Sequence, residues 1–189
     1  MDYFSNSFSV NKEKAKKALK NLSEYFGQEL EIANKNIFKS FYELKANGIP
    51  ILSLRGTDFW GNHHEIAGFE KVWELSKPSV WRSTIEVREK DSSAVIATFE
   101  SSAFGKTNTI TLPRGEKLLI VTHIWKSMYE LQNELGTRLV SFENKKWFSP
   151  TIKITVEKKL DALDKYPFIL MLVFFTVLQR QHQAAAVSV

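Results

Sequence analysis

The chain has 189 residues, of which 43% are hydrophobic and 13% aromatic, enough for one domain with a large core and too many for a disordered chain. It contains no cysteine, which excludes disulfides, thiolate catalysis and cysteine-based metal sites. The net charge is +5, and five lysines and one glutamate place +4 of it between residues 12 and 20. Because nucleic-acid-binding domains usually spread basic residues over a face, we expect no nucleic-acid partner.

The N-terminal segment, residues 1–27, is predicted to contain a basic amphipathic helix from about Asn11 to Phe26. Apolar residues recur at helical spacing from Val10 to Phe26, and Gly27 ends the pattern. Two interpretations stay open: the helix packs its apolar stripe on the domain, or it binds a membrane surface or a partner. In the second case the lysines on its polar side would contact anionic lipid, namely Lys12, Lys14, Lys16, Lys17 and Lys20.

The chain from Glu29 to Lys159 has the pattern of short β-strands separated by turns. Asn47-Gly48 joins two such runs, and this pair predicts a type I′ hairpin because both central residues need a positive φ. Ile85 and Val87 alternate with polar residues in the same way as Val95, Ala97 and Phe99. The spacing predicts ten to twelve strands in an antiparallel meander or barrel.

The most apolar segment, Phe168 to Leu178, contains no charge and one hydroxyl. Asp164 is predicted as the N-cap of a helix over about residues 165–183, with Pro167 in its first turn. Such a helix is apolar on every side and too short to cross a bilayer, so it needs burial in protein. Its structural positions are Phe168, Leu170, Leu172, Val173 and Phe175.

The strands are the part of the chain that can bury this helix. We therefore predict that residues 28–189 form a mainly β domain, an antiparallel sheet of ten to twelve strands that curls around the hydrophobic C-terminal helix. The alternative is a tail-anchored protein, in which Phe168 to Val177 inserts into lipid.

His63-His64-Glu65 is the first candidate for chemistry. Adjacent histidines on a strand point to opposite faces, so they do not easily share one metal ion. The second histidine of a zincin helix is also missing. We interpret the segment as a solvated loop and predict no metal site.

Gly105-Lys106-Thr107 matches the end of a P-loop, but the position that needs the first glycine is Glu100. A strand pattern follows where the motif needs a helix. We therefore predict no nucleotide site and no other cofactor.

His123 shares its parity with Leu119 and Val121, which predicts a hydrogen-bonded histidine in the core or the barrel lumen. A catalytic base would need a partner that the sequence does not indicate. Asp161 and Asp164 are three residues apart just before the terminal helix, so helix capping is the better interpretation. No catalytic residue is predicted.

Lys145, Lys146 and Trp147 combine positive charge with an aromatic ring. Such a mixture is typical of an interfacial patch that contacts lipid headgroups. More often such a mixture is a turn that leads into a strand, and both interpretations can hold at once.

Three groups of residues give the chain a resemblance to a known superfamily. They are the hairpin Phe38 to Leu54, the strand segments Trp81–Ile85 and Lys146–Phe148, and Asp164-Lys165-Tyr166-Pro167 before the apolar helix. Together they resemble the tubby C-terminal-like superfamily, and within it the LURP-one-related proteins more than tubby itself. The resemblance covers about residues 28–183.

The resemblance implies a barrel of about twelve strands closed around a hydrophobic helix. Tubby-like domains bind phosphoinositides and phospholipid scramblases move lipids, so it also implies lipid binding as an inherited expectation. Scramblases carry acylated cysteines and an acidic calcium segment, and this chain has neither. The basic residues of the tubby lipid site have no match here.

The sequence therefore favours a non-enzymatic binding module for phosphoinositide-like headgroups of anionic phospholipid or for a protein partner. A scramblase-like lipid-handling protein is the further alternative, and an enzyme with a scattered site stays open. No signal-peptide core follows the first ten residues. We expect a cytoplasmic protein, peripheral to the membrane if it binds lipid.

Overall fold

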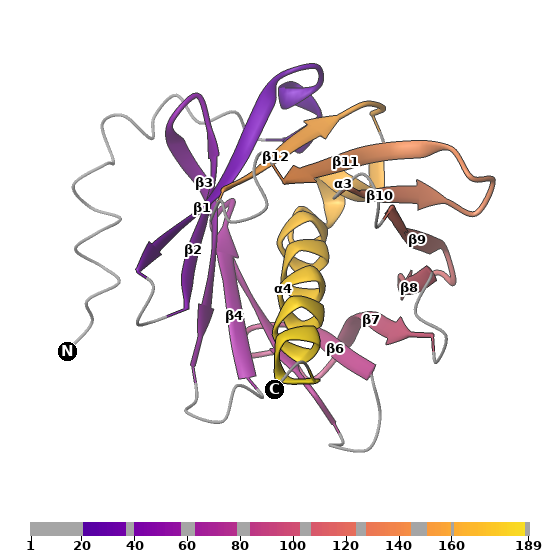
Figure 1. Cartoon of the computed structure of the whole chain (residues 1–189). Helices are drawn as coiled ribbons and strands as arrows, with labels where there is room; N and C mark the ends of the chain where they lie inside the picture. The colour runs from indigo at the N-terminus through magenta and orange to yellow at the C-terminus, as the bar shows by residue number, and fades with distance from the viewer. Residues whose placement is uncertain are drawn as a thin grey trace.

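A computed structural model describes residues 21–36, 40–57, 63–78, 84–102, 107–123, 128–144, 151–159 and 161–187, with only the backbone for 35, 36 and 180–187. After the 3₁₀-helix η1 (Leu22–Tyr25) it contains twelve strands, followed by helices α3 (Asp161–Lys165) and α4 (Ile169–Val187) (Figure 1). The strands are β1 (Glu29–Asn36), β2 (Phe41–Ala46), β3 (Ile49–Gly56), β4 (His63–Gly68), β5 (Lys71–Ser76), β6 (Thr84–Glu89), β7 (Val95–Ser101), β8 (Thr107–Thr111), β9 (Lys117–His123), β10 (Met128–Asn133), β11 (Arg138–Asn144) and β12 (Thr151–Val156).

The strands form one closed antiparallel barrel. Each strand pairs with the next in the chain, and β1 pairs with β12 through Leu30 and Ile154 to close it. A closed barrel leaves no unpaired sheet edge. The predicted closed barrel of about twelve antiparallel strands is confirmed.

The hairpin of β2 and β3 has the predicted turn. Asn47 and Gly48 have φ values of 50° and 77°, and the flanking residues Ala46 and Ile49 are paired across β2 and β3. Two successive positive φ values are the mark of a type I′ turn, whose twist matches that of the strands.

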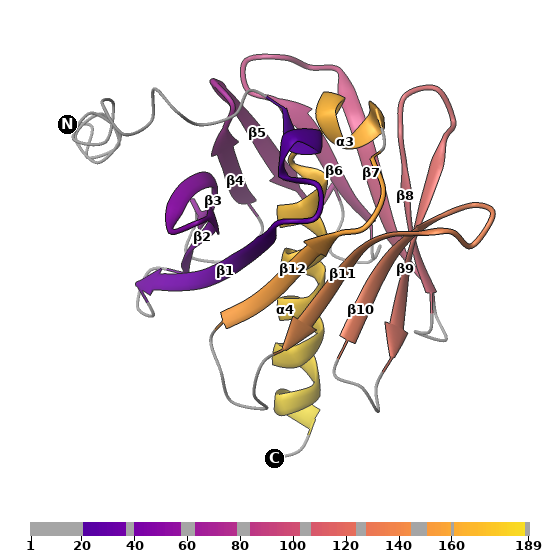
Figure 2. The ribbon, with the colours of Figure 1, turned by 90° about the horizontal axis from the view of Figure 1, so that it is seen from above.

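Helix α4 occupies the interior of the barrel, as two perpendicular views show (Figures 1 and 2). Residues Phe168 to Val177 are each no more than 5% exposed. Aromatic rings of the strands pack on this segment. The ring centroids of Trp73 and Phe168 are 5.4 Å apart, and those of Tyr42 and Phe174 are 4.9 Å apart. The lone hydroxyl, that of Thr176, donates to the carbonyl oxygen of Val173 at 2.8 Å. Protein atoms therefore surround the apolar helix.

The start of the terminal helix differs from the prediction. Residues 161–165 form the separate helix α3, and α4 begins at Ile169 and extends to Val187 instead of covering about 165–183. Proline disfavours a helical conformation of the residue before it, so the chain leaves the helix at Tyr166. Asp164 consequently does not cap α4; its Oδ1 accepts a hydrogen bond from the backbone N–H of Ser23.

The predicted N-terminal helix lies mostly outside the described residues. In its last part the structure has η1, whose Leu22 and Tyr25 are buried at 1% and 4% exposure. Gly27 has a φ of 72° and its N–H donates to the carbonyl oxygen of Val156. The chain thus turns at the predicted glycine and enters β1 beside the end of β12.

Candidate binding pocket on strands β3 to β6

Four charged residues lie in one row across the outer face of the barrel. Arg55 of β3 is opposite Glu65 of β4, which is opposite Glu74 of β5, which is opposite Arg88 of β6. Their strand neighbours, such as Ile66 and Leu75, are buried against α4. Alternation along each strand therefore places the charged row outside.

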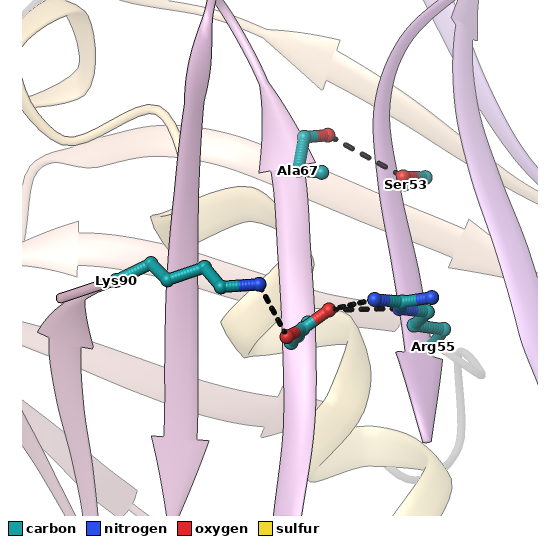
Figure 3. A network of polar contacts seen from close by, with 5 residues as sticks. Ser53, Arg55, Ala67 and Lys90 are labelled. Carbon is teal, nitrogen blue, oxygen red and sulfur yellow. Dashed lines mark hydrogen bonds and ion pairs between the residues drawn. The ribbon is translucent and has the colours of Figure 1, made fainter. Parts of the chain in front are cut away.

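Glu65 is the most enclosed carboxylate of the row, with 13% of its side chain exposed. Arg55 donates to Glu65 Oε2 from Nε at 2.8 Å and also from Nη2, while Lys90 Nζ lies 3.4 Å from Oε1. Figure 3 shows Arg55 and Lys90 reaching this point from opposite sides of β4. On the same face, the Ser53 hydroxyl points to the carbonyl oxygen of Ala67 at 3.5 Å. Burial raises the pKa of Glu65, but the hydrogen bonds and charges of Arg55 and Lys90 outweigh it and hold the pKa below 4.5.

Arg88, at the other end of the row, contacts Ser76 and Glu86 with its guanidinium. Its Nη1 donates to the hydroxyl of Ser76 at 3.3 Å, and its Nη2 contacts the carboxylate of Glu86. Among the described residues, none forms a hydrogen bond or ion pair with the side chain of Glu74, which is exposed.

A pocket with a volume of about 260 Å³ lies at this place. Its walls come from the end of β3, the start of β4, the end of β5, and β6: Thr57, His63, His64, Glu65, Glu74, Leu75, Ser76 and Arg88. Residues with hydroxyl, carboxylate, imidazole and guanidinium groups line it together with Leu75. Such a mixture suits a small polar ligand.

The two adjacent histidines point to opposite faces, as predicted. His64 is opposite Leu75 and its ring lies 4.3 Å from that of Phe175, inside the barrel, whereas His63 is exposed and opposite Ser76. The predicted solvated loop is wrong, because both residues belong to β4. Over the ranges that the structure describes, no group of three or more histidine and carboxylate residues is placed to hold a metal ion.

His123 lies on the outer face, so the predicted core or lumen position is wrong. Leu118 and Ile120 of β9 are buried, and His123 has the opposite parity. Its Nε2 is 3.3 Å from Oε2 of Glu130. Arg138 also contacts Glu130, with 3.0 Å between Nη1 and Oε1. This is a surface charge cluster on β9 to β11.

The lysines that were predicted to contact lipid lie outside the described residues, as do Lys145, Lys146, Trp147 and the segment Gly105-Lys106. The described residues that flank the two groups lie at opposite ends of β12. Gly27, after the first group, bonds to Val156, whereas Asn144, before the second, is paired with Ile152.

The sequence did not indicate Glu74, Ser76 and Arg88 as site residues. Their alternation with buried neighbours shows that they face outward, but their meeting with His63 and Thr57 depends on the register of four strands. The sequence pattern around these residues therefore predicts that they lie on the outer face of strands, but not that they share a pocket.

The fold is similar to that of a protein from Arabidopsis thaliana, AT5G01750, whose X-ray structure is known. The likeness covers 85% of this chain and 98% of that chain, with a TM-score of 0.57 and 9% sequence identity. At this identity it shows the barrel fold alone. No family model and no curated protein matches the chain.

Proposed function

We propose that this protein is a non-enzymatic binding module of the tubby C-terminal-like superfamily, closest to the LURP-one-related proteins. The filled interior carries this proposal. Residues Phe168 to Val177 are buried between the strands, so recognition takes place on the outer surface and at the ends of a rigid barrel. The similar barrel of the Arabidopsis protein supports the barrel architecture that this superfamily implies.

The proposed ligand is the headgroup of an anionic phospholipid at a membrane surface. The lysine cluster of residues 12–20 supplies +4 of the net charge of +5, and each lysine near an anionic membrane contributes about 1 kcal/mol of attraction. Lys145, Lys146 and Trp147 are the second proposed contact. Asn144, which precedes this contact in the chain, is paired with Ile152 of β12.

The tail-anchor alternative lacks the exposed segment that it requires. The residues that would insert into lipid are enclosed by strands. Among the described residues, moreover, no helix combines the length and the apolar character needed to cross a membrane.

Cosedimentation with vesicles of phosphatidylcholine, with and without phosphatidylserine or a phosphoinositide, tests the proposal. Replacing Lys12, Lys14, Lys16 and Lys17 by Glu should abolish binding to the anionic vesicles. A matched control replaces four other basic residues on the described surface by Glu: Lys77, Arg114, Lys117 and Lys158.

The control should retain most of the binding, since the attraction is local to the cluster and screened within about 8 Å at physiological salt. Equal loss in both variants would mean that net charge alone is sensed. No binding of the wild type to any anionic vesicle would contradict lipid recognition and leave a protein partner as the ligand.

A further inference from the structure

We propose that the pocket on β3 to β6 binds a protonated amine, with Glu74 as its counter-ion. This goes beyond the proposed lipid contact, because it concerns a different surface and a ligand of opposite charge. The cavity of about 260 Å³ is formed by described residues alone. It is large enough for an ammonium group on a short alkyl chain.

Glu74 has no basic partner among the described residues. Of the nearby basic residues, Arg55 and Lys90 contact Glu65, and Arg88 contacts Glu86 and Ser76. Glu74 is the carboxylate of the pocket wall that none of them neutralises.

The register adds a second argument. Glu74 lies directly opposite Glu65 on the same face of β4 and β5. Like charges in such a cross-strand pair repel each other and destabilise the sheet. Arg55 and Lys90 offset the charge of Glu65, so the carboxylate that a bound cation would compensate is that of Glu74.

Other residues of the pocket wall can accept hydrogen bonds from an amine. An ammonium group has three N–H donors and no acceptor. Next to the Glu74 carboxylate, the pocket offers the hydroxyl oxygens of Thr57 and Ser76. Leu75 and His64 also line the pocket.

Two sources of an amine fit this chemistry, a free small amine and a lysine side chain of a peptide. The probes are therefore n-butylammonium and N-acetyl-lysine-N-methylamide, with n-butanol as the neutral analogue of the first. Amide chemical shifts of the full-length, 15N-labelled protein should report saturable binding around Glu74 and Ser76 in the millimolar range, at constant ionic strength. Binding of both probes assigns the site to a lysine side chain, and binding of butylammonium alone to a free amine.

Glu74→Gln keeps the shape of the side chain and should weaken amine binding about tenfold, the effect of one hydrogen bond to a charged group. Glu116→Gln, at an exposed turn elsewhere, is the matched control and should bind as the wild type does. Arg88→Gln removes the basic residue opposite Glu74 and should bind at least as tightly. The proposal is overturned if neither amine gives saturable shifts, if butanol binds equally well, or if Glu74→Gln binds like the wild type. Because no lipid is present, these results are independent of the vesicle experiment.

Discussion

The carboxylate of Asp164 accepts a hydrogen bond of 2.6 Å from the backbone N–H of Ser23, 141 residues earlier in the chain. Ser23 lies in the first turn of η1, whose N-cap residue Asn21 makes no side-chain cap. A residue of α3 thus satisfies one of the orphan donors of η1. The bond ties the start of the described chain to the segment that leads into α4.

Asp164→Ala should lower the free energy of unfolding by about 1–2 kcal/mol, the usual effect of removing a capping carboxylate. Urea denaturation followed by circular dichroism measures it. Asp161→Ala, an exposed residue of the same helix, is the control and should change stability less. Equal effects of the two substitutions would show that the bond to Ser23 does not stabilise the fold.

Gly68 at the end of β4 should not tolerate a side chain. A Cβ at this position would lie 2.3 Å from the carbonyl oxygen of Ile51 and 3.1 Å from the Cα of Leu52, where the backbone has little room to move. Gly68→Ala should cost more than about 3 kcal/mol, within the class of severe substitutions. At Gly56 the nearest atoms are 3.7 Å away in the side chain of His64, so Gly56→Ala is the control and should be mild. A stable Gly68→Ala protein would contradict the packing of β3 against β4.

Glu65 should contribute to the dependence of stability on pH. Its pKa is lowered in the folded protein because Arg55 and Lys90 outweigh the effect of burial, so the folded state binds the proton less readily than the unfolded state does. The stabilisation by the ionised Glu65 is present when the pH is above 4.5, the ordinary pKa of glutamate. It is lost as the pH falls through the lower pKa of Glu65 in the folded protein.

The test compares the wild type with Glu65→Gln in urea between pH 7 and pH 3. The difference in unfolding free energy should shrink toward acid. A difference that is constant over this range would refute the assigned role of the two basic residues.

Leu172 tests the apolar environment of α4 at one position. Its side chain is fully buried. Leu172→Asp places an unpaired carboxylate in the core, which costs several kcal/mol and is comparable with the whole stability of a domain. Leu172→Met keeps the volume and should remain folded. An aspartate variant with native-like near-ultraviolet circular dichroism would place this residue outside the core.

The strongest local patterns predicted the architecture. The charge-free run from Phe168 to Leu178 required burial, and Asn47-Gly48 required a type I′ turn. The alternation at Ile85, Val87, Ala97 and Phe99 also indicated the inward face, since all four side chains are buried. Val95 is 38% exposed, and β7 pairs with β6 there through a register shift between Val87 and Arg88.

Features that depend on distant pairing could not be predicted. The run from Leu118 to Trp125 is apolar on both parities, so only the closed barrel decides that Leu118 and Ile120 face α4 and His123 does not. The bond between Asp164 and Ser23 has no local signal at all. The candidate pocket likewise needs the register of four strands to bring Glu74, Arg88 and His63 together.

The central claim is that α4 is the core of the barrel, without which the strands cannot close. Thermal melting of a chain that ends at Pro167, followed by circular dichroism, tests it most directly. Removal of α4 exposes the inward faces of all twelve strands, so we expect no cooperative transition and no native near-ultraviolet signal. A cooperative, native-like melt of the shortened chain would contradict the account.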